Sequence, residues 1–247
     1  MTLDPEDALP TEGLVCVVGA GGKKTTLYTL ANRLDRAVVT ATVRIPIFDD
    51  HVARVEVTQD PVSALPTAGA DDFPLGLVPE QERDDRYLGY ETATVDAVAD
   101  AHDGPVLVKA DGARMREFKA PADREPQIPA SADAVVPIAS AHVVGDPLTD
   151  ERVHRPERVA ALTDCSVGED VTADAVGTVL ASPAGGLKDV PADAEVVALV
   201  NKVDDEADEA VARAIAAAAF EADEEGRLDR VVLAALGEGR IVDVIER

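Results

Sequence analysis

Tryptophan is absent from this sequence of 247 residues, and all aromatic residues together make up only 3% of it. Hydrophobic residues still account for 46%, so a core is expected, built from alanine, valine, leucine and isoleucine. Cys16 and Cys165 are too few for a disulfide framework, which favours a reducing compartment. No apolar run reaches the roughly 18 residues of a membrane helix, and the N-terminal segment MTLDPEDALPTEG lacks the features of a signal peptide. We therefore expect a cytoplasmic protein without a membrane partner.

Basic residues are scarce as well. Lysine and arginine number 23 against 48 aspartates and glutamates, the net charge is −25, and only six of the basic residues are lysines. Such an acidic surface repels itself in dilute buffer, and about 1 M salt, with a Debye length of roughly 3 Å, screens most of that repulsion. We interpret this charge as adaptation to a salt-rich cytoplasm, as in a haloarchaeal protein; the alternative is an acidic protein of an ordinary cell. Nucleic acid is not expected as a partner, because its phosphates would meet a surface of like charge.

Short β-rich apolar runs alternate with helical patterns along the chain. This alternation is typical of an α/β fold with a mostly parallel sheet and helices on both faces. The expected strands are Leu14–Val18, Ala37–Val43, Pro105–Ala110, Ala132–Ala139, Glu195–Val200 and Arg230–Ala235. The expected helices are Thr25–Leu34, Glu91–Ala101, Pro156–Leu162, Ala173–Leu180 and Glu206–Ala222. The length suits a single domain over residues 1–247, with a small insertion at about 49–90 that is either irregular or a satellite β element.

The stretch VGAGGKKTT, Val18–Thr26, has the context of a phosphate-binding loop, since it lies between a predicted strand and a predicted helix. Its small residues allow backbone N–H groups to turn toward an oxyanion, and the helix N-terminus adds about half a positive charge. This predicts a P-loop NTPase-like fold and a nucleotide site. The expected nucleotide contacts are Gly19, Ala20, Gly21, Gly22, Lys23, Lys24, Thr25 and Thr26.

The second lysine of this loop leaves two arrangements open. In the first, Lys23 is the phosphate lysine, Lys24 occupies the usual hydroxyl position and Thr25 substitutes as the Mg²⁺ ligand. In the second, Lys24 and Thr25 form the lysine–hydroxyl pair, and Lys23 stands in the usual glycine position. A glycine-rich turn with solvated lysines is the alternative without nucleotide.

Two polar motifs directly follow other predicted strands. Asp111, after PVLVKA, is a candidate Mg²⁺ ligand and, with Lys23 and Lys24, a candidate catalytic residue; a turn-forming Asp-Gly pair is the alternative. The motif NKVD, with Asn201, Lys202 and Asp204, is typical of guanine-nucleotide proteins, in which the aspartate accepts from the ring N–H and the exocyclic amine of guanine. Adenine offers no matching donor pair, so GTP is favoured over ATP; the alternative is a polar turn.

Two further groups are candidates for contact with a substrate or anion. Arg116, Lys119 and Arg124 are cations within a proline-rich segment, and they either meet an anion or pair with surface carboxylates. Thr40 and Thr42 lie at the end of the second predicted strand, near the same crevice, and are expected to contact Mg²⁺ or the attacking water. No histidine lies at metal-ligand spacing from a cysteine, so no structural zinc is predicted.

Taken in order, these motifs resemble one family, the selenium-dependent (molybdenum) hydroxylase accessory proteins often called YqeC. The matching segments are Gly19–Lys23, Thr40–Arg44, Ala110–Ala113, Phe118–Pro129, Val143–Leu148, Val153–Glu157, Gly185–Lys188 and Asn201–Asp204. They span nearly the whole chain, and the string KAPADREPQIP is the most specific. The chain departs from the family pattern at Lys24, where threonine or serine is usual, and at Lys109, where glutamate is usual.

The resemblance implies a role in the maturation of molybdenum hydroxylases or in inserting their cofactor, with such an enzyme or another maturation factor as partner. Combined with the motifs, it predicts a P-loop nucleotide-binding protein, a Mg²⁺-dependent GTPase or ATPase. Two alternatives stay open. One is a nucleotide-binding adaptor that does not hydrolyse, and the other is a phosphoryl or nucleotidyl transferase acting on a small acceptor held by Arg116, Lys119 and Arg124.

Overall fold

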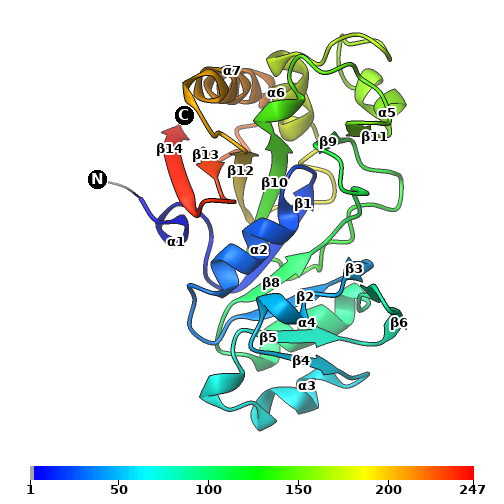
Figure 1. Cartoon of the computed structure of the whole chain (residues 1–247), viewed down its shortest axis with the longest axis vertical. Helices are drawn as coiled ribbons and strands as arrows, with labels where there is room; N and C mark the ends of the chain where they lie inside the picture. The colour runs from blue at the N-terminus through cyan, green and yellow to red at the C-terminus, as the bar shows by residue number, and fades with distance from the viewer. Residues whose placement is uncertain (1–2) are drawn as a thin grey trace.

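A computed structural model describes residues 3–247, and a nine-stranded sheet runs through the length of the molecule (Figure 1). Every neighbouring pair of strands in it is parallel except the last, where β14 is antiparallel to β13. In spatial order the strands are β14 (Arg240–Glu246), β13 (Arg230–Ala235), β12 (Glu195–Asn201), β10 (Ala134–Ser140), β1 (Leu14–Gly19), β8 (Val106–Lys109), β2 (Val38–Ala41), β5 (Leu75–Val78) and β4 (Arg54–Val57). The prediction of an α/β fold with a mostly parallel sheet is confirmed.

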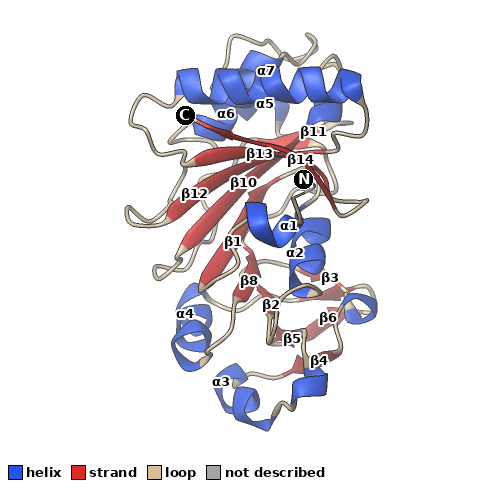
Figure 2. Cartoon of the chain, turned by 90° about the vertical axis from the view of Figure 1, so that its left-hand side faces the viewer, coloured by secondary structure: helices blue, strands red, loops and turns tan. Residues whose placement is uncertain are grey.

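Helices cover both faces of this sheet, as Figure 2 shows. One apolar cluster joins α1 and α2 to one face, and two others join the remaining main helices to the opposite face. The helices are α1 (Pro5–Ala8), α2 (Lys23–Ala31), α3 (Pro61–Ala64), α4 (Thr92–Ala101), α5 (Pro156–Ala160), α6 (Ala173–Ala181) and α7 (Glu206–Ala222). Valine, leucine, isoleucine and alanine supply most of the buried side chains, which fits the shortage of aromatic residues. Among residues 3–247, no helix combines the length and apolarity that crossing a membrane requires.

The region at 49–90 contributes both to the central sheet and to a smaller one. Its strands β4 and β5 extend the central sheet beside β2. The smaller antiparallel sheet contains β3 (Ile45–Pro46), β7 (Arg86–Tyr87) and β6 (Gln81–Arg83). A two-stranded parallel pair, β9 (Phe118–Lys119) and β11 (Val153–His154), lies apart from both sheets in the hydrogen-bond pattern.

The strand order determines where a ligand can bind. Strand β1 lies between β8 and β10, so the chain passes to one side of β1 for β2 and β8 and to the other side for β10 and β12. In open parallel sheets, ligands bind outside the carboxyl ends of the strands, where the order diverges in this way. The ends of β1, β8, β10 and β12 are therefore the place to look for a site.

Candidate functional site

The loop between β1 and α2 is built so closely that it requires glycine at two positions. Gly21 has φ +99°, and a Cβ there would lie 2.5 Å from the backbone nitrogen of Ser140. Gly22 precedes the first helical residue with φ +139°, and a Cβ there would lie 2.2 Å from the side-chain nitrogen of Asn201. Residues other than glycine rarely adopt such φ values. The loop is thus packed against the backbone at the end of β10 and against the side chain of Asn201 at the end of β12.

Lys23 is the lysine that points into this loop. It is the first residue of α2, its side chain is only 5% exposed, and its ammonium contacts the carbonyl of Gly19. The same ammonium lies 2.8 Å from Oδ1 of Asp111. Lys24 is half-buried and Thr25 is exposed. Of the two lysines, Lys23 is therefore the one that the first arrangement places in the loop, and Lys24 follows it on α2; which lysine meets a phosphate stays a prediction.

Asp111 is the centre of a buried ion-pair network. The backbone N–H of Gly19 donates to its Oδ2 over 2.8 Å, and the ammonium of Lys119 lies 2.9 Å from the same oxygen. Lys119 also contacts Glu125 at 2.7 Å, and Arg155 contacts Glu125 at 2.8 Å. Asp111 and Lys119 are 1% and 3% exposed, so their charges are shielded from water. The network joins the loop of β1 to the segment after β8.

Burial and charge act against each other on these groups. Burial raises the pKa of Asp111, but the ammonium groups of Lys23 and Lys119 outweigh it and hold that pKa below its usual range. Burial lowers the pKa of Lys23 despite the nearby carboxylate. The pKa of Lys109 is lowered to about 7, mainly by burial and secondly by the charge of Lys23. Lys109 donates to the carbonyls of Arg44 and Asp111 over 2.9 and 2.7 Å, so a third buried amine stands beside Asp111.

All six lysines of this acidic chain lie around the loop. Lys24 adjoins Lys23 on α2, and Lys202 contacts Glu117 at 2.7 Å. Lys188 donates over 2.6 Å to the carbonyl of Glu125 and thereby holds the segment that carries the buried carboxylate. The remaining three are the buried Lys23, Lys109 and Lys119. Three of only six lysines are thus buried beside Asp111, in a chain whose net charge is −25.

Asn201, in the NKVD motif, fastens the loop to the neighbouring strands. Its Nδ2 donates to the carbonyl of Gly21 over 2.9 Å, and its Oδ1 accepts from the N–H of Leu236 over 3.0 Å, just beyond β13. Asp204 is half exposed, and its Oδ2 lies 3.3 Å from Nε2 of His142. Asp208 lies at the same distance from that nitrogen, and ligand atoms of the three side chains lie within 4.8 Å of one another. Among the described residues, His142, Asp204 and Asp208 are the one group of a histidine and two carboxylates whose ligand atoms lie this close together.

The structure brings some of the remaining predicted residues to the loop and directs others elsewhere. The carbonyl of Arg116 accepts from the N–H of Gly21 over 3.2 Å, so its segment touches the loop. Lys119 is not free for an anion, since two carboxylates and the carbonyl of Gly112 surround its ammonium. Arg124 is exposed. The remaining two, Thr40 and Thr42, donate their hydroxyls to the carbonyls of Leu77 and Gln127 over 2.8 and 2.6 Å, so both are engaged within the chain.

Mg²⁺ prefers six oxygen ligands in octahedral geometry, and the described residues near the loop do not offer such a set. Thr25, the expected hydroxyl ligand, is exposed on α2, and the hydroxyl of Thr26 donates to the carbonyl of Gly22 over 3.2 Å. An ammonium faces each carboxylate oxygen of Asp111, the other expected ligand. The expectation of Mg²⁺ stays a prediction, and the donor set by itself does not support it.

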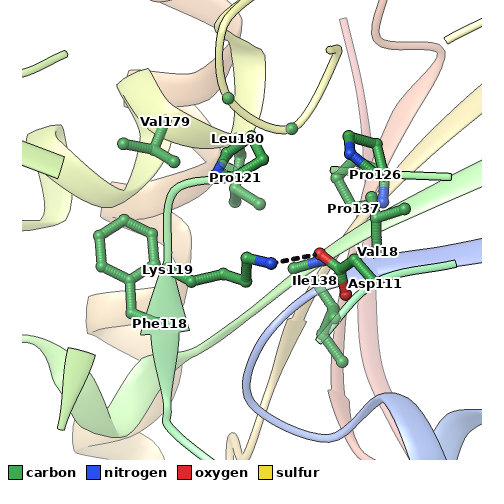
Figure 3. A pocket seen from close by; sticks show the side chains of 13 residues that line it. Val18, Asp111, Phe118, Lys119, Pro121, Pro126, Pro137, Ile138, Val179 and Leu180 are labelled. Carbon is green, nitrogen blue, oxygen red and sulfur yellow. Dashed lines mark hydrogen bonds and ion pairs between the residues drawn. The ribbon is translucent and has the colours of Figure 1, made fainter. Parts of the chain in front are cut away.

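A small, mainly apolar cavity opens beside this network (Figure 3). Lys119 extends toward Asp111 at one side of it, and apolar side chains from several elements surround the rest. Gly185 and Gly186 complete the wall, where a Cβ would lie 2.2 and 2.3 Å from the carbonyls of Val179 and Leu180. The apolar lining is Val18, Phe118, Pro121, Pro126, Pro137, Ile138, Val179 and Leu180. These surroundings explain why the ion pair of Asp111 is dry.

Several residues of the site have no role that the sequence predicts. Glu125 and Lys188 lie in segments that carry the family resemblance, yet their contact across the fold is not visible in either segment alone. Arg155 and Glu117 complete ion pairs with Glu125 and Lys202. The signal in the sequence that could have identified these contacts is the scarcity of lysine, because each lysine in so acidic a chain is a candidate for a specific partner.

Comparison with known proteins identifies a family that the chain matches. The family described as YqeC protein matches residues 15–157, more than half of the chain, including the loop and Asp111. The chain is also 27% identical over 194 residues to the uncharacterized protein YqeC of Escherichia coli (strain K12), covering 76% of this chain and 75% of that protein. The chain belongs to the YqeC protein family.

Proposed function

We propose that this protein binds a nucleotide by its phosphates at the loop Gly19–Lys23, with a P-loop NTPase-like fold. The observation that supports it best is the buried Lys23 at the start of α2, inside a glycine loop at the carboxyl edge of a parallel sheet. Backbone N–H groups, a helix N-terminus and a lysine together form a site for phosphate. The concentration of ammonium groups there supports an anionic ligand in an otherwise acidic protein.

The base preference that we propose is guanine over adenine. Asn201 holds the NKVD turn against the loop by its two hydrogen bonds, so the base side and the phosphate side are mechanically linked. Asp204 lies on the same turn with a half-exposed carboxylate, which is free to exchange His142 for the donor pair of guanine. Lys202 lies between Asn201 and Asp204 in the sequence, and its ammonium pairs with Glu117.

Once the nucleotide is bound, the protein has two candidate activities. In the first, it hydrolyses GTP or ATP. The ion pair between Lys23 and Asp111 then changes with the state of the nucleotide and moves the 112–129 segment, which the ion pairs of Lys119 tie to the loop. In the second, it binds nucleotide without turnover, and the presence of Lys24 in the hydroxyl position favours this activity. In either case, the family resemblance supports a role as accessory to the maturation of molybdenum hydroxylases, with such an enzyme or another maturation factor as partner.

Thermal unfolding of the full chain in molar KCl, with GTP, with ATP and without nucleotide, tests the binding proposal. A ligand at 100 times its Kd should add about 2.7 kcal/mol to the free energy of unfolding. We expect a shift with GTP, a smaller one with ATP and none for Lys23→Ala, whose fold is checked by circular dichroism. No shift with either nucleotide would overturn the proposal.

Phosphate release from labelled GTP separates the two activities. Free phosphate supports hydrolysis, and tight binding without release supports the adaptor. Label on a small molecule supports the transferase instead.

A further inference from the structure

We propose that the loop holds the phosphates of its nucleotide with the protein's own lysines and does not use Mg²⁺. This inference rests on the proposed nucleotide binding and specifies how the phosphate charge is neutralised. It concerns the ligand as the free polyanion rather than as its magnesium complex. Three features of the structure support it in turn.

The first feature is the residue that comes after the phosphate lysine. In phosphate loops of the Gly-Lys-Ser/Thr type, the hydroxyl at this position binds Mg²⁺. Here Lys23 starts the helix and points inward, so the position is occupied by Lys24, the next residue of α2. An ammonium cannot ligate a metal ion, but it supplies a positive charge and three donors to a phosphate. Lys24 thus removes the hydroxyl that would bind Mg²⁺ and also supplies a positive charge in place of the metal ion.

The second feature is the state of Asp111, the carboxylate nearest the loop. Its Oδ1 faces Lys23 at 2.8 Å, and its Oδ2 faces Lys119 at 2.9 Å and accepts from the N–H of Gly19. If Lys23 turns to a bound phosphate, Oδ1 is released, but Lys119 and Gly19 still hold Oδ2. Glu125 and the carbonyl of Gly112 fix Lys119 independently of the nucleotide. An ammonium therefore stays beside the carboxylate that would have to receive Mg²⁺.

The third feature is the excess of positive charge. The buried network contains the carboxylates of Asp111 and Glu125, and facing them are Lys23, Lys119 and Arg155. Lys24 adds another cation in the first turn of α2, and the N-terminus of that helix adds about half a positive charge. Placing a divalent cation among these groups would set like charges together within a poorly solvated site. An anionic phosphate, in contrast, is attracted by this excess of positive charge.

Isothermal titration calorimetry of the full chain with GTP, once in EDTA and once in excess Mg²⁺, tests the inference. We expect a Kd in EDTA equal to that in Mg²⁺ within about threefold, or tighter. Tightening by Mg²⁺ of about tenfold or more would overturn the inference while leaving nucleotide binding intact. Absence of binding in both conditions would overturn the proposed function as well, so the two failures are distinguishable.

Two neighbouring variants complete the test. Lys24→Thr restores the usual hydroxyl, and we expect it to weaken binding in EDTA by roughly tenfold and to make the loss recoverable with Mg²⁺. Thr25→Ala removes the adjacent exposed hydroxyl, and the inference expects that its Kd, like that of the parent, does not depend on Mg²⁺. If Mg²⁺ tightens binding to the parent but not to Thr25→Ala, Thr25 is a metal ligand and the inference is overturned. Circular dichroism confirms that each variant is folded.

Discussion

Substituting Gly22 by alanine should be among the most destabilising single changes in this protein. The added Cβ would lie 2.2 Å from Nδ2 of Asn201, in a residue whose φ is +139°. A non-glycine residue in such a backbone conformation costs of order 1–3 kcal/mol. Displacing the buried amide also leaves the carbonyl of Gly21 and the N–H of Leu236 without partners. Such losses cost about 1–3 kcal/mol each.

The backbone strain and the two lost hydrogen bonds together give an expected loss of about 3–9 kcal/mol in the free energy of unfolding. For a domain of this size, one kcal/mol corresponds to about 2–4 °C in Tm, so Tm should fall by about 6 °C or more. Urea unfolding followed by circular dichroism measures the loss directly, with an unchanged m-value showing that the unfolding transition is of the same kind.

The chain offers two controls that separate backbone strain from collision. Gly145 has φ +87° but nothing within 4 Å of an added Cβ, so Gly145→Ala should show the backbone cost alone. Gly237 has open space and no positive φ, so Gly237→Ala should change stability by less than about 0.5 kcal/mol. In an Asn201→Ala background the collision at Gly22 is gone, and Gly22→Ala should cost no more than Gly145→Ala. If Gly22→Ala in the parent costs no more than Gly145→Ala, the close packing of loop and Asn201 does not exist as described.

Three further outcomes are expected. Asp204→Asn should weaken GTP binding by about tenfold or more and leave ATP binding unchanged, because a charged acceptor for two guanine donors contributes about 1.5–3 kcal/mol; equal effects on both nucleotides in calorimetry would count against the guanine assignment. The pKa of His154 is lowered to about 4, mainly by burial and secondly by the charge of Arg155. The unfolded chain therefore binds more protons at this residue between about pH 6.5 and 4, stability should fall as pH falls through that window, and His154→Gln should remove about 1–3 kcal/mol of that fall in urea titrations at each pH. Finally, Tm should rise as KCl is raised toward molar concentrations, since the net charge of −25 is screened; a Tm that falls with salt would contradict the halophilic interpretation.

The parts of the fold that the sequence predicts best are those with a continuous local signal. The β-rich runs at β1, β8, β10 and β12 are buried on both faces and have few polar interruptions, so their positions follow from composition. The alanine-rich α7 has the bounds that its composition predicts, Glu206–Ala222. The strand β14 has no such signal, because it is an antiparallel edge strand whose partly exposed face has no continuous apolar run. Strands β4 and β5 are ambiguous in the sequence because prolines and aspartates surround them.

The start of α2 shows how a local error arises from a non-local cause. The sequence predicts the helix from Thr25, and the helix begins at Lys23. Propensity does not distinguish these two starts. The position of Gly22 decides it, because Asn201, far along the chain, leaves room for no side chain there. Which lysine turns inward therefore depends on a contact that no sequence window contains.

The ion-pair network also depends on contacts between segments that lie far apart in the sequence. Lys23, Asp111, Lys119 and Glu125 come from separate segments, and each is visible in the sequence only as a charged residue near a turn. Their partners follow from the parallel topology, which brings the ends of β1 and β8 side by side. The sequence nominates most of these residues, but the number of cations around Asp111 depends on how the segment after β8 folds back.

The acidic surface and the basic site act over different distances, which allows one chain to have both. Repulsion among surface carboxylates extends through solvent and is screened within about a Debye length, roughly 3 Å at 1 M salt. The contacts of Asp111 with Lys23 and Lys119 are 2.8 and 2.9 Å long and lie in a site almost closed to water, so salt screens them little. A salt concentration that relieves the surface therefore leaves the attraction of the site for an anion in place. The buried Lys23 and Lys119 therefore keep their charges effective in a salt-rich solution, although the surface of the chain is strongly acidic.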